Sequence, residues 1–485
     1  MFLNKPVVFW ILTIAVINVL IISQLVQDGM FMDGMLYTAV SKNLSEGLGT
    51  FWNPHFSKTS MSSFHEQPPL YFGLLAVFYK VFGTSMYVER LFVFVFYTLT
   101  LVYICKLWKK LFITNAKIAK NTWLPVLFYS VIPVCFWAYT NHVEEVVMCA
   151  FALMAIYYTY IALFLNEKII LNLVLSGCFI FLASLTKGVQ GLFPIACVAF
   201  YWLTTKNVSL KKTITYSFIL AGVPALIYSS LIFCNHNVYL SFEQYFTNRF
   251  VKTFNNFYAT TNNRFEIIIR LITELLPILS VSILIKLISK KNMPQNQQVV
   301  ESKRKLWWLL AIGLSGSLPL AITTEQRGFY LVTALPYFAL AISAWLAPTL
   351  TYLLDKINLQ KTAFKFFSYS VALFLFISVG YTVLQIGNFN RDKDLLTDIY
   401  AIGKVVPKGE MINVPKQTWD EWDIQGYFIR YFYISLDVTQ NKHPYFMMQK
   451  NLPDSLVPNG YKLYPLKNTL LDLYTLSSKK EKIIK

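Results

Sequence analysis

The chain has 485 residues, of which 55% are apolar and only 14% are charged. A soluble domain carries about 25% charged residues, so this composition excludes an ordinary soluble protein and predicts one that spans a membrane. The net charge of +18 could indicate nucleic-acid binding, but the lysines lie in short loops between apolar segments, and we expect no nucleic-acid partner. All six cysteines lie in or at the ends of apolar segments without metal-ligand spacing, so no disulfide framework is indicated.

Eleven apolar segments are long enough to cross the hydrocarbon core of a bilayer, which takes roughly 20 helical residues. They are residues 7–27, 89–108, 122–141, 145–165, 168–186, 189–205, 213–234, 266–288, 306–322, 328–349 and 363–388. The first follows only six residues and has no small-residue cleavage site, so we interpret it as a retained helix and not as a signal peptide. The pattern predicts an all-α polytopic membrane domain.

Lysine and arginine concentrate in alternate loops of this pattern. With the N-terminus inside, the inner loops are short and basic, whereas most acidic residues fall outside. The positive-inside rule supports this orientation and explains most of the net charge. We therefore predict a multi-pass protein of the bacterial inner (cytoplasmic) membrane, with two long loops, 28–88 and 235–265, and a polar tail on the periplasmic side.

The first outer loop contains two helical patterns. "DGMLYTAVSKNLSEG" repeats apolar residues at helical spacing and predicts an amphipathic helix on the membrane surface. "PPLYFGLLAVFYKVFG" is too short to span and predicts an interfacial or re-entrant helix, with Pro68 and Pro69 in its first turn. Asp33 precedes the first helix, and His65 and Glu66 precede the second, so both places carry ionisable groups.

The tail beyond residue 389 reads as a small C-terminal α/β domain. "DLLTDIYAIGKVV" predicts a helix, whereas "GEMINVPK", "HPYFMMQK" and "GYKLYPLK" predict short strands bounded by Pro, Gly and Asn. The sequence therefore predicts two domains, a membrane domain of residues 1–388 that includes the outer loop 28–88, and an extracytoplasmic domain of residues 389–485.

Ionisable residues recur where predicted helices begin at the outer face. They are Asp33, Glu66, Glu144, Lys187, and Arg327 with Tyr330. Each alone has a structural explanation, because an acid can cap a helix or complement its dipole and a lysine can snorkel to the headgroups. A lysine anchor on the outer face, however, runs against the positive-inside bias, and free N–H groups at a helix start favour an anion. Four outer loops with such groups at one depth indicate a functional site.

His65 and Glu66 are also candidate ligands for a divalent metal ion. Adjacent residues rarely converge on one ion, and no third ligand is identifiable in the sequence. Metal dependence therefore stays open, with Glu66 as the candidate ligand.

The order of these motifs resembles a known family. Asp33 in the first loop, "HEQPPLYF" from residue 65, Glu144, "LTKG" ending at Gly188 and "RGFYLVTALP" from Arg327 are together similar to the GT-C glycosyltransferases of the protein O-mannosyltransferase and aminoarabinose transferase (ArnT-like) group. The resemblance covers about residues 1–350. It implies a GT-C membrane domain with a catalytic first outer loop, and the tail is similar to periplasmic domains of such enzymes in placement only.

The resemblance also implies roles for the candidate residues. Asp33 corresponds to the general base, Glu66 to an acid beside the donor site that can ligate a divalent ion, and Glu144 to the substrate-side carboxylate. Lys187 corresponds to a ligand of the lipid phosphate.

Arg327 and Tyr330 resemble further phosphate contacts of that group. The sequence departs from the family at two places: Asp33 is followed by glycine where a second acid is frequent, and Gln67 stands where a basic residue is frequent. The missing cation puts more weight on Lys187 and Arg327 as phosphate ligands.

The implied reaction moves a sugar from a polyprenyl-phosphate donor to a lipid, glycan or protein acceptor at the outer face. Fixed cations stabilise the departing phosphate and one base activates the acceptor hydroxyl, so the reaction most simply inverts the anomeric centre. Two alternatives stay open, a transporter or flippase of lipid-linked sugars and a ligase or polymerase of surface polysaccharide. A transporter commonly shows paired repeats and charges near the midplane, and neither is visible in the sequence.

Overall fold

The computed structural model describes residues 4–254, 259–289, 299–439 and 442–476. Contacts between Cα atoms divide the chain into two compact units. The first unit comprises Met1–Val26, His65–Leu70 and Arg90–Ile386, and the second comprises Gln27–Phe64, Tyr71–Glu89 and Gly387–Lys485.

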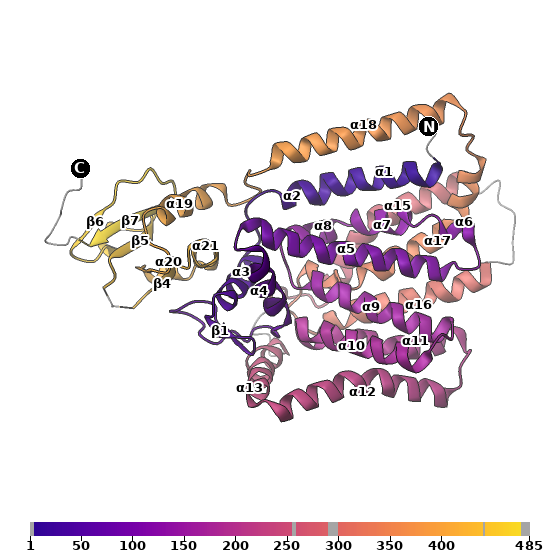
Figure 1. The fold of residues 1–485 in the computed structure, drawn as a ribbon, viewed down its shortest axis with the longest axis horizontal. Helices are drawn as coiled ribbons and strands as arrows, with labels where there is room; N and C mark the ends of the chain where they lie inside the picture. The colour runs from indigo at the N-terminus through magenta and orange to yellow at the C-terminus, as the bar shows by residue number, and fades with distance from the viewer. Residues whose placement is uncertain (1–3, 255–258, 290–298, 440–441, 477–485) are drawn as a thin grey trace. The chain divides into compact units, whose positions relative to one another are not determined.

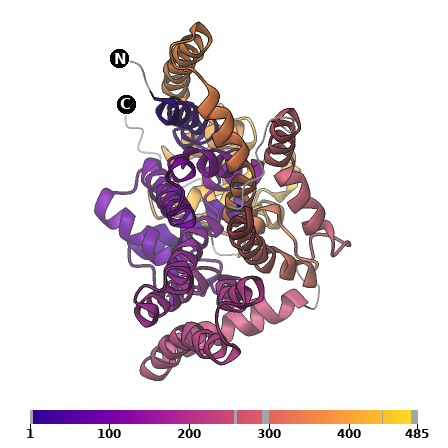
Figure 2. The same ribbon diagram turned by 90° about the vertical axis from the view of Figure 1, so that its right-hand side faces the viewer.

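The first unit is a bundle of apolar helices that run alongside one another in Figure 1 and are seen end-on in Figure 2. Its long helices are α1 (Lys5–Ile17) continued by η1 (Asn18–Ile22) and α2 (Ser23–Leu25), α5 (Met86–Leu111), α9 (Glu145–Phe164), α10 (Ile169–Lys187), α11 (Cys197–Thr205), α12 (Leu210–Cys234), α15 (Glu266–Ser289), α16 (Val299–Ser317), α17 (Leu335–Lys356) and α18 (Thr362–Gln385). In α9, 83% of the most apolar stretch is buried, against 11% in α12, so α9 lies at the centre and α12 at the edge.

The described part of the chain has nine helical segments that are long and apolar enough to cross a membrane. A tenth is the pair α7 (Trp123–Ser130) and α8 (Pro133–Thr140), which meet at an angle of 73°. The polytopic all-α membrane domain predicted from the sequence is thereby confirmed.

The sequence predicted eleven spans, one more than these ten segments, and the difference arises in a single segment that is counted once. Residues 168–186 and 189–205, predicted as two spans, form one apolar segment, Ile169–Thr205, interrupted by the 3-10 stretch η2 (Gly188–Ala196). A Cβ added to Gly191 would lie 2.4 Å from the carbonyl carbon of Ala183. Eight residues of straight helix would separate the two by about 12 Å, so the chain folds back on itself after α10. The two halves of this segment therefore correspond to the two predicted spans, 168–186 and 189–205.

The sequence analysis predicted no elements in the loop 235–265, and much of the part that the structure describes is helical. It contains α13 (His236–Gln244), the π-helix η3 (Tyr245–Phe250) and α14 (Val251–Phe254). Two further short 3-10 segments, η5 (Leu318–Ile322) and η6 (Gly328–Leu331), precede α17, and α6 (Ala116–Ala119) lies between α5 and α7.

The second unit contains the predicted C-terminal α/β domain. Its five-stranded sheet has the order β4 (Ser435–Asp437), β3 (Met411–Asn413), β5 (Tyr445–Gln449), β7 (Leu471–Leu476) and β6 (Tyr461–Leu463). Strand β3 runs parallel to both neighbours, with Ile412 opposite Leu436, whereas β7 is antiparallel to β5 and β6. The helices are α19 (Lys393–Gly403), α20 (Lys416–Trp419) and α21 (Trp422–Phe432), and η7 (Asp454–Leu456) is a 3-10 turn. The predicted helix and the three predicted strands are all present.

The first outer loop packs in this second unit. It forms α3 (Met32–Ser45), the hairpin β1 (Gly49–Thr50) and β2 (Asn53–Pro54), and most of α4 (Leu70–Phe82). The sequence placed this loop in the membrane domain, and the structure instead groups it with the C-terminal domain. The apolar spacing in α3 predicts which face of the helix is buried. It does not indicate which other part of the chain covers that face.

The predicted orientation can be tested with reporter fusions. We expect alkaline phosphatase fused after Leu470, in the second unit, to be active, because the enzyme folds only outside the cytoplasm. Fusion after Lys211, in the basic loop before α12, is expected to be inactive. Both fusions are compared at equal abundance on immunoblots, and the reverse pattern would show that the predicted orientation is wrong.

Candidate functional site

A cavity of about 460 Å³ lies in the first unit and is lined by both polar and apolar side chains. Its polar lining consists of Gln67, Lys187, Gln190, Tyr245, Arg249, Thr253, Ser315, Thr323, Glu325 and Tyr330. Its apolar lining includes Leu192, Phe193, Phe250, Phe254, Pro319 and Ile322. Most of these residues lie on the short segments η2, η3, α14, η5 and η6, whereas Lys187 ends α10 and Ser315 lies on α16. The cavity therefore offers charged groups and an apolar wall to one ligand.

Lys187 is the last residue of α10 and is almost completely buried, with 7% of its side chain exposed. Its Nζ lies 2.8 Å from Glu145 Oε1 and 3.8 Å from Glu144 Oε2 at the start of α9. Both carboxylates are fully buried, and Nζ also lies 5.1 Å from the ring centre of Tyr330. A snorkelling lysine would extend to the headgroups, whereas this one is held inside by two acids.

The glycine that follows Lys187 is required by its backbone conformation and by a close contact. Its φ is +69°, a conformation that side chains disfavour, and an added Cβ would lie 2.0 Å from the hydroxyl of Tyr245. The glycine therefore lets η3 approach the end of α10 closely. This approach brings Tyr245 and, one helical turn later, Arg249 to the cavity.

Arg249 is the second cation of the cavity, with 15% of its side chain exposed. Its Nη1 donates to Glu325 Oε2 at 2.9 Å, its Nη2 also pairs with Glu325, and its Nε lies 3.2 Å from Glu66 Oε2. Glu325 additionally accepts hydrogen bonds from Tyr330 at 2.8 Å and Thr253 at 3.2 Å. The guanidinium of Arg249 on η3 thus contacts two other segments, the loop before α4 and the segment before α17.

The sequence did not identify Arg249 or Glu325 as site residues. The segment "FTNRFVKTF" has no motif, and its π-helical geometry has no sequence signature that we used. A signal existed nevertheless, because Arg249 is a cation on a loop assigned to the outer face, where the charge bias disfavours it.

Arg327 lies elsewhere. Its side chain is exposed, and it is not among the described residues that line the cavity. Arg327 supplies the N-cap position of η6, whereas Tyr330, from the same motif, lines the cavity. Among the described residues that line the cavity, the cation beside Lys187 is therefore Arg249 and not the predicted Arg327.

Two of the loop residues have shifted pKa values. Burial raises the pKa of Glu66; the nearby Arg249 opposes this rise and the carboxylate of Glu325 adds to it. Burial lowers the pKa of His65, which favours the neutral imidazole, and its Nδ1 lies 3.3 Å from Ser241 Oγ. Glu66 stays 41% exposed, so it can exchange protons with solvent.

The residues around Glu66 do not fit a preformed metal site. Within the ranges that the structure describes, no group of three or more His, Cys, Asp or Glu side chains is arranged to hold an ion. The imidazole of His65 contacts Ser241, and the carboxylate of Glu66 contacts Arg249. We therefore derive no chemical step through a metal.

Asp33 belongs to the second unit, on α3. The N-cap position of α3 is occupied by Phe31, so Asp33 is the second helical residue and its side chain is half-buried. The interpretation of Asp33 as a helix cap is wrong. Glu66 does not cap α4 either, since Pro68 and Pro69 stand between it and the first helical residue, Leu70.

Comparison with known proteins identifies the fold. Residues 66–233 match the family model described as dolichyl-phosphate-mannose-protein mannosyltransferase. No curated protein matches the chain in sequence. The crystal structure of ArnT from Cupriavidus metallidurans bound to undecaprenyl phosphate superimposes with a TM-score of 0.65, at 12% identity, over 96% of this chain and 98% of that one.

The apo structure of the same ArnT gives a TM-score of 0.65 at 13% identity, over 96% of this chain and 97% of that one. The archaeal oligosaccharyltransferase AglB from Archaeoglobus fulgidus, in complex with an inhibitory peptide and a dolichol-phosphate, gives 0.47 at 12% identity, over 90% and 69%. The resemblance to the ArnT-like group that the motifs indicated is confirmed, and the chain has the GT-C fold of ArnT.

Proposed function

We propose that the protein is an integral membrane glycosyltransferase that transfers a sugar from a polyprenyl-phosphate donor to a lipid, glycan or protein acceptor at the outer face of the inner membrane. The observation that carries the proposal is the cavity of the first unit, whose lining combines the buried Lys187 and the partly buried Arg249 with a set of apolar side chains. A lipid phosphate likewise has a charged part and an apolar part. The solved ArnT structure of the same fold holds undecaprenyl phosphate, which supports this choice of ligand.

The apolar lining fits a polyprenyl chain. Phe250 and Phe254 come from η3 and α14, and Pro319 and Ile322 come from η5, so the wall is built from elements on two sides. Each Å² of apolar surface removed from water stabilises binding by about 25 cal/mol. A free nucleotide sugar would leave this wall uncovered, whereas a lipid-linked donor covers it.

The polar lining fits a phosphate that becomes a leaving group. Lys187, Arg249 and the hydroxyl of Tyr330 can donate hydrogen bonds or supply positive charge there. Charge develops on the phosphate as the glycosidic bond breaks, and fixed cations in a site shielded from water stabilise that charge strongly. The phosphate can leave without being protonated, so no acid is needed on that side of the sugar.

The acceptor hydroxyl needs one base, and Asp33 is our candidate. A carboxylate that removes the hydroxyl proton lets the oxygen attack the anomeric carbon on the face opposite the phosphate. One displacement of this kind inverts the configuration. Glu144 and Glu145 are occupied with Lys187 and fully buried, so their evident role is to hold that lysine.

The role of Lys187 can be tested by donor binding. Lys187→Met alone would leave two buried carboxylates without their cation, which costs about 3–5 kcal/mol of stability, so the test variant is Lys187→Met combined with Glu145→Gln. We expect the affinity for undecaprenyl phosphate in nanodiscs to fall about 10- to 100-fold, since a hydrogen bond to a charged group contributes about 1.5–3 kcal/mol. The control is Lys211→Met, at an exposed lysine of an inner loop. Wild-type affinity in the double variant would show that Lys187 does not bind the phosphate and only neutralises the two glutamates.

The role of Asp33 can be tested by turnover. Asp33→Asn keeps the size of the side chain but cannot take a proton, and we expect sugar transfer to fall about 10²–10⁴-fold while binding of undecaprenyl phosphate is unchanged. The matched control is Asp394→Asn, which removes the same charge from the same helical position of α19, at an exposed site. The helix-dipole effect of either change is only about 0.3–1 kcal/mol. If Asp33→Asn transfers labelled sugar at the wild-type rate, the base lies elsewhere.

The raised pKa of Glu66 predicts a pH dependence of donor binding. When pH falls toward that pKa, Glu66 takes up a proton and Arg249 loses one of its two carboxylate partners. Arg249 then interacts more strongly with a phosphate, so we expect the affinity for undecaprenyl phosphate to increase as pH is lowered from 8 to 5. Glu66→Gln fixes the neutral state and is expected to remove this part of the dependence. Measuring both proteins with the same lipid cancels the titration of the phosphate, and identical pH profiles would contradict the prediction.

A further inference from the structure

We propose that helix α21 of the C-terminal domain is a positioning element for catalysis: it holds α3, and with it Asp33, so the C-terminal domain is a working part of the enzyme. The proposal rests on the proposed function and on Asp33 as base. It is carried by contacts within the second unit, between the first outer loop and residues beyond 387.

The first outer loop contributes to the core of the C-terminal domain. Met30 and Met35, which flank Asp33 in the sequence, are at most 1% exposed and belong to one buried cluster with residues of α19, α21 and the sheet. Members of that cluster from the tail include Leu396, Tyr427 and Ile412. The helix that bears Asp33 is therefore anchored in the same core as the sheet.

Helices α3 and α21 approach each other closely at a glycine. A Cβ added to Gly426 would lie 2.6 Å from Cγ of Met35. Real Cβ atoms essentially never come so near another atom, so any larger residue at 426 must displace Met35 or the helix that carries it. Met35 is two residues beyond Asp33, within the same helical turn.

The segment that enters α3 is fixed by a buried acid. Asp28 is 3% exposed and accepts hydrogen bonds from the hydroxyls of Tyr400 and Tyr431, each at 2.5 Å. Its backbone pairs with the start of the tail, since its N–H donates to Asn388 and its carbonyl accepts from Asn390, each at 2.8 Å. The start of the loop is thus attached to the C-terminal domain by both side chain and backbone.

Tyr427 adds a second attachment on the same face of α21. Its hydroxyl accepts a hydrogen bond from the N–H of Met30 at 3.2 Å and donates to Asp392 at 2.9 Å. Met30 is three residues before Asp33, so contacts on both sides of the candidate base lead to α21.

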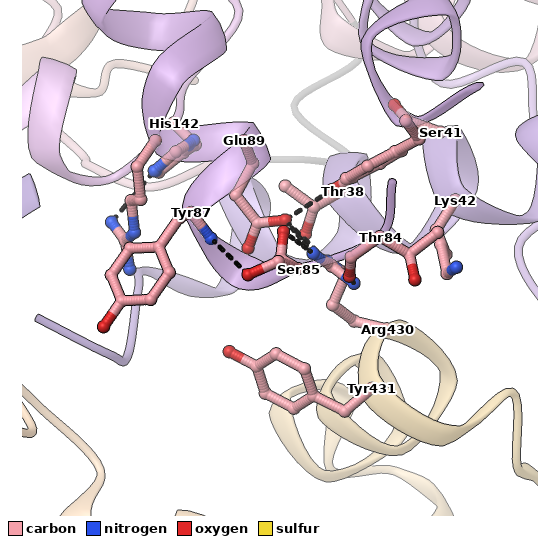
Figure 3. A network of polar contacts seen from close by, with 12 residues as sticks. Thr38, Ser41, Lys42, Thr84, Ser85, Tyr87, Glu89, His142, Arg430 and Tyr431 are labelled. Carbon is pink, nitrogen blue, oxygen red and sulfur yellow. Dashed lines mark hydrogen bonds and ion pairs between the residues drawn. The ribbon is translucent and has the colours of Figure 1, made fainter. Parts of the chain in front are cut away.

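The end of the loop is held by an ion pair from the next turn of α21. Figure 3 shows Arg430 directed at Glu89, with Nε donating to its carboxylate at 2.6 Å. Arg430 also donates to the carbonyl oxygens of Thr84 and Ser85, each at 3.2 Å, and Glu89 accepts from Tyr79 at 2.5 Å. The arginine and the glutamate are 1% and 0% exposed, so this pair is specific and strongly constrained in position.

The residues of α21 that make these contacts lie on one face. Gly426, Tyr427, Arg430 and Tyr431 follow the spacing i, i+1, i+4 and i+5, which places them on neighbouring turns of one side of a helix. That side contacts both the beginning and the end of the first outer loop. A base must lie within hydrogen-bond reach of its proton, and an error of about 1 Å can lower a rate 10²-fold. A helix that fixes both ends of the loop meets this requirement.

The test uses a graded series at the glycine contact. Gly426→Ala and Gly426→Val are expected to lower kcat by about 3-fold and at least 10-fold, because the larger side chain shifts Met35 and α3 further. Affinity for undecaprenyl phosphate is expected to stay within twofold of wild type, since its cavity belongs to the first unit. Met35→Ala removes Cγ, and we expect it to restore most of the rate in the Gly426→Ala background. The control is Gly222→Ala, where an added Cβ meets nothing within 4 Å.

Two results would overturn the proposal. One is a wild-type kcat in Gly426→Val. The other is a loss of rate that Met35→Ala does not relieve and that parallels an equal loss of donor affinity, since this pattern indicates general misfolding.

A second measurement needs no catalytic assay. If the wild-type protein transfers no sugar, the proposed function fails, and hydrogen exchange of the amides of Met32–Ser45 still decides whether α21 holds α3. We expect faster exchange of these amides in Gly426→Val and in Glu89→Gln combined with Arg430→Met, with unchanged exchange in α9. Unchanged exchange in α3 would show that α21 does not hold it.

Discussion

The candidate site depends on how the protein buries a lysine. Lys187 has lost almost all of its water, and a buried ammonium is tolerated only beside a compensating charge. Glu145 and Glu144 supply it from the first residues of α9, the helix that lies at the centre of the bundle. This pairing ties the C-terminal end of α10 to the start of α9. The reversal of the chain at Gly188 follows directly, and with it the approach of Tyr245 and the polar lining of the cavity.

Both cations of the cavity share one arrangement. Lys187 lies between Glu144 and Glu145, and Arg249 lies between Glu66 and Glu325. In each case a cation is held in position by two carboxylates before any ligand arrives. Such a site is preorganised, because the donors need little movement when a phosphate binds. The carboxylates also weaken the attraction for anions in general, so a ligand must add other interactions to bind well, and the apolar wall offers these to a lipid.

Features that depend on a single segment could be predicted from the sequence, whereas contacts between distant segments could not. The apolar runs predicted the spans, and motifs at predicted helix ends singled out three site residues. Of these, Lys187 and Tyr330 line the cavity and Glu144 pairs with Lys187, whereas their predicted roles stay predictions. The sequence analysis did not identify Arg249, whose segment is π-helical, and selected Arg327 because it shares a motif with Tyr330 at the start of a predicted helix. Adjacency does not fix direction, however, and a residue at an N-cap position can point away from the side chain three residues later.

Because distant contacts cannot be read from the sequence, α3 was assigned to the membrane domain. Its apolar spacing predicted a membrane-surface helix, since a buried face with no known partner is most simply assigned to lipid. Met35 is instead covered by Gly426, almost four hundred residues later in the chain. No local pattern identifies such a contact. A glycine in the middle of a helix destabilises it by roughly 0.5–1 kcal/mol relative to alanine, so Gly426 within α21 indicated that something approaches there, without indicating what.

The two carboxylates that the sequence placed together in one outer loop belong to different units. Glu66 contacts Arg249 of the donor cavity, whereas Asp33 lies on a helix built into the core of the C-terminal domain. In the proposed reaction the first of these regions binds the lipid-linked donor, and the second carries the group that activates the acceptor. The cavity can therefore keep the features that recognise a lipid phosphate while the surroundings of α3 vary with the acceptor.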